Sequence, residues 1–226
     1  MPKAPRPPEA VQQVRKTILD AAASIIYQDG FSNVSMRKIA AKTEMTAANL
    51  YNYFSGKDEI YLAIQTRGFA ELHARFRQIQ TAGLDPQQTV GRMIAAYIDF
   101  GRANPDQYEI MFTRNTPKYA DYLGTAMEPA ARTEKETALR VAACAERAIA
   151  SAYAGHPEPA DADPSLVTIE LWTALHGMVS LLNSRVLQEV ESDTDAVVQS
   201  LVERLTARFM PAADDNDSLQ AISKFI

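Results

Sequence analysis

The side chains that could carry catalysis or bind a metal are few in this 226-residue sequence, and they lie far apart. The three histidines, His73, His156 and His176, fall on separate predicted elements, and none has a carboxylate at metal-ligand spacing. The sequence also has no glycine-rich phosphate loop and no pattern of an activated nucleophile. We therefore expect no enzyme, no metal site and no cofactor.

Cysteine usage and hydropathy indicate the compartment. The single cysteine, Cys144, stands among alanines and is typical of a small buried residue, which excludes an internal disulfide framework and fits a reducing cytosol. No stretch approaches about 18 uninterrupted apolar residues, and charges and prolines occupy the N-terminus where a signal peptide would be apolar. We expect a cytoplasmic protein with no membrane partner.

Charge is distributed unevenly along the chain. The net charge of -5 argues against nucleic acid binding if the chain is treated as one body. Residues 1–62, however, carry 8 basic and 6 acidic residues, whereas the rest of the chain carries 15 and 22. This asymmetry has the direction expected for a DNA-binding head on an acidic body, and it gives modest support to that interpretation.

Apolar residues recur at helical spacing through most of the chain, which predicts an all-α fold. Residues 1–9, with four prolines, are expected to be a disordered arm. One helix then runs to Gly30, a short second helix follows the N-cap Ser35, and a third follows the N-cap Thr46 and carries Leu50 and Phe54. These three helices form a helix-turn-helix pattern, so we assign residues 10–56 to a DNA-binding domain.

A second, larger domain is expected at residues 57–210. Residues 55–58 have the form of a capping box that starts a long fourth helix, and more helices follow up to residue 153. Residues 155–164 hold prolines and acids and are predicted to be a loop. Two apolar helices, roughly 165–190 and 194–210, come next, and residues 211–226 are expected to form a disordered tail.

The residues of the first domain resemble a known family. Three runs carry the resemblance, residues 18–22 (ILDAA), 30–40 (GFSNVSMRKIA) and 50–60 (LYNYFSGKDEI). Together they are similar to the DNA-binding domain of TetR-family transcriptional regulators, over about residues 15–62. The resemblance implies a cytoplasmic, ligand-responsive repressor that binds double-stranded operator DNA and is released from a pseudo-palindromic operator by a small-molecule inducer.

The resemblance also implies which residues contact DNA. Ser35 and Thr46 stand at helix starts, where a hydroxyl and free backbone N–H groups can hold a phosphate oxygen. Bases are then read by Ala47, Ala48 and Asn49, because alanine fits a thymine methyl and asparagine pairs with an adenine edge. Tyr51, Tyr53 and Lys57 grip the DNA backbone, and Arg37 is a candidate for an additional contact with a base or a phosphate.

Glu44 departs from the family pattern. The family usually has glycine in this turn, where the backbone adopts a left-handed conformation. A non-glycine residue there costs about 1 kcal/mol and adds a negative charge close to DNA. We expect weaker non-specific DNA binding as a result.

Two further segments resemble the TetR subgroup whose C-terminal domain is named for a Trp-His-Gly signature, residues 104–112 (NPDQYEIMF) and 172–177 (WTALHG). Trp172 and His176 share one helix face, and Gly177 would let another helix approach closely. Each of these two side chains either faces a ligand or belongs to the core. The residues expected near a mostly apolar inducer are Tyr97, Phe100, Tyr108, Met111, Phe112, Trp172 and His176.

The second domain is expected to form a homodimer by pairing the last two helices with their copies in a four-helix bundle. The alternative to a DNA-binding regulator is a helical interaction module that has lost DNA binding. Glu44 and the negative net charge are the features that favour this alternative.

Overall fold

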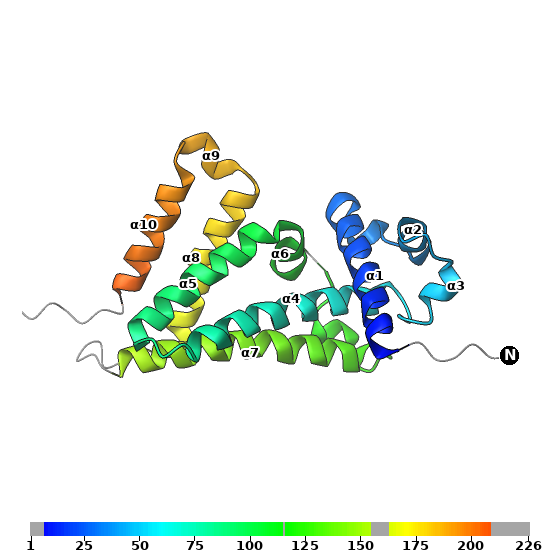
Figure 1. The fold of residues 1–226 in the computed structure, drawn as a ribbon, viewed down its shortest axis with the longest axis horizontal. Helices are drawn as coiled ribbons and strands as arrows, with labels where there is room; N and C mark the ends of the chain where they lie inside the picture. Colours follow the sequence, from blue (N-terminus) through cyan, green and yellow to red (C-terminus); the bar gives the residue numbers. More distant parts are fainter. Residues whose placement is uncertain (1–6, 115, 155–162, 209–226) are drawn as a thin grey trace, which may run out of the picture. The chain divides into compact units, whose positions relative to one another are not determined.

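The computed structural model describes residues 7–114, 116–154 and 163–208. Helices make up the regular structure of these residues, and no strand occurs among them, which confirms the all-α class (Figure 1). The elements in chain order are α1 (Pro8–Asp29), the 3-10 helix η1 (Phe31–Asn33), α2 (Met36–Lys42), α3 (Ala47–Leu50), α4 (Lys57–Gln80), α5 (Pro86–Ala103), α6 (Pro105–Phe112), the 3-10 helix η2 (Tyr119–Tyr122), α7 (Glu128–Tyr153), α8 (Pro164–Asn183), α9 (Val186–Val190) and α10 (Thr194–Ala207).

The chain forms two compact units that do not follow the predicted domain boundaries. One unit comprises Met1–Gln78 with Tyr97–Cys144, and the other comprises Ile79–Ala96 with Ala145–Ile226. The helix-turn-helix segment therefore shares a unit with α6 and with the first part of α7. The boundaries at residues 10–56 and 57–210 stay a prediction about function. The predicted tail lies outside the described residues, as do residues 1–6 of the predicted arm and 155–162 of the predicted loop.

The core of the helix-turn-helix segment is built by apolar residues from α1, α2, α3 and α4. Ile18, Ile39, Leu50 and Ile60 are fully buried in it, and Ile110 of α6 belongs to the same cluster. Two predicted N-caps are confirmed, because the side chain of Ser35 accepts a hydrogen bond from the Lys38 N–H and that of Thr46 accepts one from the Asn49 N–H.

Four local expectations need correction. Helix α1 begins at Pro8, inside the predicted arm, because proline suits the first helical turn. Helix α3 ends at Leu50, so Phe54 is buried from a turn and not from the helix. The acid that closes the start of α4 is Glu59, not Asp58.

The fourth correction concerns the helix expected at 165–190. It is broken between α8 and α9, where Arg185 adopts a left-handed backbone with φ 61° and donates its N–H to the Leu182 carbonyl.

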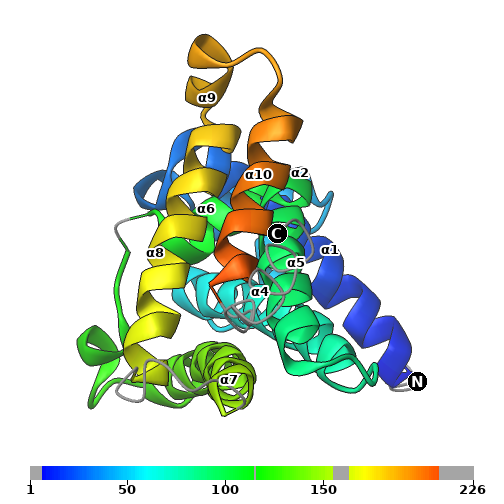
Figure 2. The ribbon, with the colours of Figure 1, turned by 90° about the vertical axis from the view of Figure 1, so that its left-hand side faces the viewer.

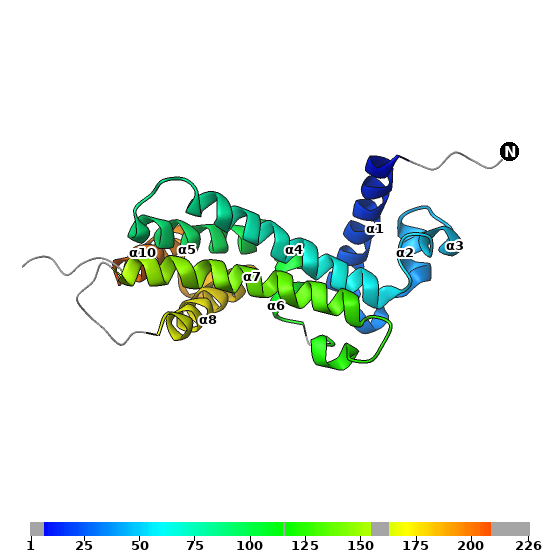
Figure 3. The ribbon, with the colours of Figure 1, turned by 90° about the horizontal axis from the view of Figure 1, so that it is seen from below.

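Helix α6 packs closely on α4 within the first unit. A Cβ atom at Gly68 of α4 would overlap the Met111 Sδ of α6, so a larger residue there would force the Met111 side chain to shift. The Ile110 carbonyl of α6 accepts hydrogen bonds from the Tyr61 hydroxyl at 3.2 Å and the Gln65 amide at 3.3 Å. Helix α4 also runs beside the first part of α7 (Figures 1 and 3), and Leu62 packs against Ala131 there.

In the second unit, α8 and α10 lie side by side (Figure 2), joined by an ion pair of 3.2 Å between Arg208 and Glu170. Helix α5 comes close to α10, since a Cβ at Gly91 would lie 2.8 Å from the Thr206 side chain. One face of α8 is buried through residues such as Leu171 and Val179.

The other face of α8 is apolar but uncovered in the single chain, with Leu166 55%, Ile169 53% and Trp172 48% exposed. By length and composition α8 is also the one helix among the described residues that could cross a membrane, a test that core helices of soluble proteins pass too.

Candidate nucleic-acid interface

The turn between α2 and α3 fixes the angle at which α3 is presented. Glu44 occupies the left-handed region with φ 54°, which confirms the conformation expected from the sequence. The Met45 N–H donates to the Ala40 carbonyl at 2.9 Å and the Glu44 N–H donates to the Ala41 carbonyl at 3.3 Å. This pair of bonds is the Schellman motif, in which the left-handed residue directly follows the helix cap. The end of α2 is thus well satisfied although its left-handed residue is not glycine.

The candidate base-reading residues lie at the start of α3. Thr46 is the exposed N-cap, Ala48 is exposed, and Ala47 and Asn49 are half-buried. The Asn49 side-chain oxygen lies 3.5 Å from the Asn52 amide nitrogen at the limit of a hydrogen bond. The first turn of α3 therefore offers two methyl groups and a carboxamide on one short surface, the chemistry that base edges in the major groove require.

The candidate backbone-gripping residues come from the start of α2, the turn after α3 and the start of α4. Tyr51, directly after α3, is 55% exposed, an unusual degree for an aromatic side chain of a helical core. Tyr53 is half-buried, and Ser35 and Arg37 are exposed at the start of α2. The Lys57 Nζ lies 4.8 Å from the centre of the Phe31 ring, so a cation–π contact holds this ammonium near η1.

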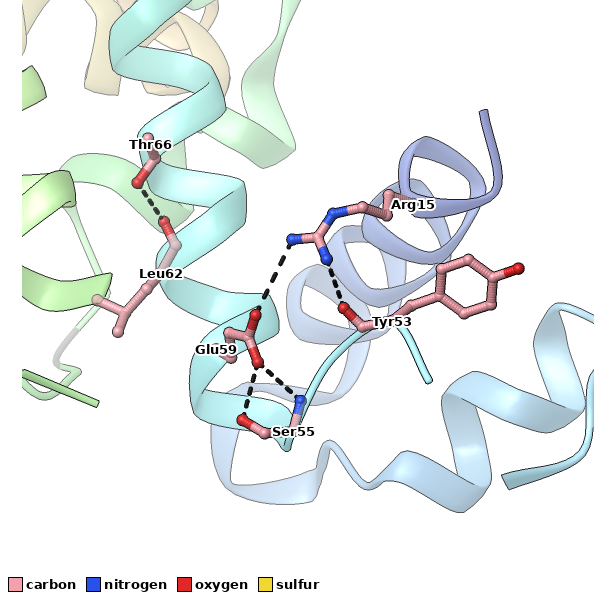
Figure 4. A network of polar contacts seen from close by, with 6 residues as sticks. All are labelled: Arg15, Tyr53, Ser55, Glu59, Leu62 and Thr66. Carbon is pink, nitrogen blue, oxygen red and sulfur yellow. Dashed lines mark hydrogen bonds and ion pairs between the residues drawn. The ribbon is translucent and has the colours of Figure 1, made fainter. Parts of the chain in front are cut away.

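A network of polar contacts that was not predicted ties the turn after α3 to α1 and α4 (Figure 4). The Arg15 guanidinium of α1 donates to the Tyr53 carbonyl, and its second amino group lies 3.9 Å from the Glu59 carboxylate of α4. The other oxygen of Glu59 accepts hydrogen bonds from the Ser55 N–H at 2.7 Å and the Ser55 hydroxyl at 2.8 Å. Arg15 lies 38 positions before Tyr53 in the sequence, so spacing alone did not single it out.

Five of the candidate ligand residues lie in the first unit, and three of them form an aromatic cluster. The Tyr97 and Tyr108 hydroxyl oxygens are 2.9 Å apart and hydrogen-bonded, and the ring centres of Tyr108 and Phe112 are 4.8 Å apart. Burial raises the pKa of Tyr108 well above its usual range, so its hydroxyl stays protonated. Phe100 and Met111 are buried as well. The cluster is thus apolar with a pair of hydroxyl groups inside it.

Trp172 and His176 lie in the second unit on α8, with ring centres 6.4 Å apart. Because Trp172 is half exposed, it is not part of the core of this chain. Burial lowers the pKa of His176 below its usual value, which favours the neutral imidazole. A Cβ at Gly177 would have no described atom within 4 Å, so none of the described helices of this chain makes the close approach that was expected there.

Cys144 is buried, as its alanine-rich surroundings predicted. Among the described residues, no group of three or more His, Cys, Asp or Glu side chains is placed to hold a metal ion.

Two family models match the chain. Residues 18–64 match the model described as bacterial regulatory proteins of the tetR family, and residues 90–205 match the tetracyclin repressor-like C-terminal domain. The second match spans both segments that resemble the Trp-His-Gly subgroup. Its description does not name that subgroup, so the finer resemblance stays a prediction.

Individual relatives agree with the family models. An uncharacterised helix-turn-helix transcriptional regulator of Mycobacterium tuberculosis is 27% identical over 210 residues, which cover 90% of this chain and 88% of the relative. The transcriptional repressor KstR of the same species is 30% identical over 103 residues, 46% of this chain and 47% of the repressor. A regulatory protein of the tetR family from Rhodococcus RHA1 has the same fold, with a TM-score of 0.69, 16% identity and coverage of 89% and 99% of the two chains.

Proposed function

Since the chain belongs to the TetR family of bacterial regulatory proteins and is a transcriptional regulator, we propose that it is a cytoplasmic repressor that a small, mostly apolar inducer releases from a pseudo-palindromic operator. Regulators of this family bind operator DNA and act as dimers. The observation that carries the proposal is the exposed edge formed by the first turn of α3 and the tyrosine that follows it.

This edge supports DNA binding because its parts serve separate tasks. The half-exposed ring of Tyr51 has no core to fill, and a phenol hydroxyl can donate to a phosphate oxygen. Ser35 and Thr46 are the N-caps of α2 and α3. At each helix start a hydroxyl and backbone N–H groups can together bind a phosphate oxygen. Ala47, Ala48 and Asn49 then read bases.

The uncovered face of α8 supports a homodimer through the last two helical regions, α8 and α10. None of the described residues of α10 is buried, although Val198, Leu201 and Leu205 recur along one side at helical spacing. Apolar faces of this kind on two neighbouring helices are what a four-helix bundle between two copies requires. Two copies would present their α3 helices about 34 to 36 Å apart, one turn of duplex DNA.

The aromatic cluster of Tyr97, Tyr108 and Phe112 supports an apolar inducer. A ligand that enters among these rings would meet apolar surface and two hydroxyl groups, a combination typical of small-molecule pockets. Phe100 and Met111, buried in the same unit, belong to this proposed set. Trp172 and His176 are proposed separately as ligand-facing residues of the second unit. The inducer would act by binding the DNA-releasing conformation more tightly than the DNA-bound one.

Binding-site selection from a random pool of duplex DNA tests the proposal. The purified protein should enrich a pseudo-palindromic sequence, and gel shifts on that duplex should weaken with salt. Tyr51→Ala and Lys57→Ala should weaken binding and leave the dimer intact. The matched control is Tyr27→Ala, another exposed tyrosine, whose carbonyl and not its ring holds Arg114. If no sequence is enriched, the chain is instead a helical interaction module that has lost DNA binding, the alternative that Glu44 and the net charge favour.

A further inference from the structure

We propose that Arg15 is a positioning residue that holds the end of α3 in the conformation in which Tyr51 and Tyr53 grip DNA, an inference that rests on the proposed function. Arg15 precedes the segment that matches the family model, which begins at residue 18. The segment it holds is short. Helix α3 has four residues, and the chain then turns through Tyr51 to Tyr53 before α4 begins at Lys57.

Arg15 makes three contacts with one guanidinium group. One amino group donates to the Tyr53 carbonyl, and the other lies 3.9 Å from the Glu59 carboxylate. The central carbon lies 4.0 Å from the centre of the Phe54 ring, whose side chain is 1% exposed. A planar guanidinium can stack on a ring and point its two amino groups at two acceptors at once, whereas a lysine ammonium cannot. The three contacts thus fix the turn against both α1 and α4.

The Tyr53 carbonyl needs such a partner. Carbonyls at the end of a helix have no backbone N–H donor within it and accept from caps, water or basic side chains. The Tyr53 carbonyl lies in the turn beyond Leu50, the last residue of α3. Here the N–H groups of Tyr53 and Phe54 both donate to the Leu50 carbonyl, and the chain then turns away from the helix axis. Arg15 supplies the donor that the helix does not.

The position of Tyr53 explains how this contact reaches DNA. Figure 4 shows the Tyr53 carbonyl facing the guanidinium while the ring of the same residue points away from it. Holding the carbonyl therefore sets the direction of the ring without contact between Arg15 and the phenol. Tyr51 is two residues earlier in the same turn. A change at Arg15 should alter where both phenols lie relative to a phosphate.

Arg67 provides a matched control. It also joins α4 to α1, with its Nη1 2.7 Å from the Asp20 Oδ1, and its side chain is 31% exposed compared with 32% for Arg15. Replacing either arginine by methionine removes one positive charge and one link between the same two helices. Only Arg15 contacts the turn after α3.

The test compares Arg15→Met, Arg15→Lys and Arg67→Met on the duplex selected by the wild-type protein. Affinity and its salt dependence are measured at a temperature where circular dichroism shows every variant to be folded. We expect Arg15→Met to bind about tenfold more weakly, the fold-change that corresponds to one charge-assisted hydrogen bond, with an unchanged salt slope. Arg15→Lys should also bind more weakly, and Arg67→Met should bind as the wild type does.

Several results would overturn the inference. Unchanged affinity in Arg15→Met, or full affinity in Arg15→Lys, means that the geometry of the guanidinium does not matter. A salt slope reduced by about one means that Arg15 contacts a phosphate directly. Equal losses in Arg15→Met and Arg67→Met mean that the arginine only stabilises the fold. Should Arg15→Met not fold, Arg15→Lys decides alone. A wild-type protein that selects no duplex refutes the proposed function instead, so the two failures are distinguishable.

Discussion

Replacing Glu44 by glycine should make this protein more stable and also bind DNA more tightly. The left-handed backbone at Glu44, with φ 54°, costs a non-glycine residue about 1 to 2 kcal/mol. Glycine removes this strain but gives the unfolded chain more freedom, which offsets about 0.5 to 1 kcal/mol. The free energy of unfolding should therefore rise by about 0.5 to 1 kcal/mol. In a chain of this size that is a rise of about 2 °C in the melting temperature.

The charge of Glu44 acts separately from its backbone conformation. The side chain is exposed between α2 and α3, next to the surface that we propose contacts DNA. Removing one negative charge there should strengthen non-specific binding at low salt by about twofold per protomer, and added salt should screen the gain. Glu44→Gln removes the charge and keeps the strained backbone, so it separates the two effects.

Thermal unfolding by circular dichroism and low-salt gel shifts on unrelated duplex DNA measure both quantities. Both variants should bind DNA more tightly, and only Glu44→Gly should melt at a higher temperature. The reasoning is refuted if Glu44→Gly melts no higher than the wild type, because the strain would then be absent. A gain in stability for Glu44→Gln would equally contradict it, since glutamine leaves the backbone strained.

Other changes give equally direct tests. Gly68→Ala should destabilise the protein by about 1 to 3 kcal/mol in chemical denaturation because the new methyl group overlaps Met111, whereas Gly177→Ala, with open space around it, should not destabilise the fold. Burial alone would raise the pKa of Asp20, but hydrogen bonds from Lys16 and Arg67 outweigh burial and lower that pKa. The ionised carboxylate therefore stabilises the fold above about pH 4, and this stabilisation is lost as the pH falls further. Melting curves of Asp20→Asn should accordingly show a smaller loss of stability than the wild type between pH 5 and pH 3. Ile169→Glu on the uncovered face of α8 should give a helical monomer in analytical ultracentrifugation, and a stable dimer would exclude this face as the interface.

Local chemistry made the helix-turn-helix segment predictable. Ser35 and Thr46 are N-caps because short hydroxyl side chains accept from the first backbone N–H groups, and this depends on residues no more than three positions away. The left-handed backbone at Glu44 was expected from the family resemblance, because the family usually has glycine in this turn. The same local rules misplaced the end of α3, because Phe54 is buried at helical spacing from Leu50 although the chain has already left the helix.

Contacts between distant residues could not be predicted from spacing. Arg15 and Tyr53 are 38 positions apart, and nothing in that spacing indicates that one holds the other, since the contact forms only when α1 and the turn after α3 pack together. The exposure of Trp172 could not be predicted from the sequence either. Its apolar character is as compatible with a core as with an uncovered face, and only the packing of α8 distinguishes the two.

Because Trp172 is exposed, the intrinsic fluorescence of the protein can report on dimer formation. This residue is the only tryptophan in the chain, and it stands half exposed on the face of α8 that we propose is shared by two copies. Indole emission shifts to longer wavelength as water reaches the ring. If the copies separate on dilution, a red shift in the emission of the unlabelled protein should therefore trace the dissociation curve. No dye would have to be attached near Tyr51 or the other groups proposed to contact DNA.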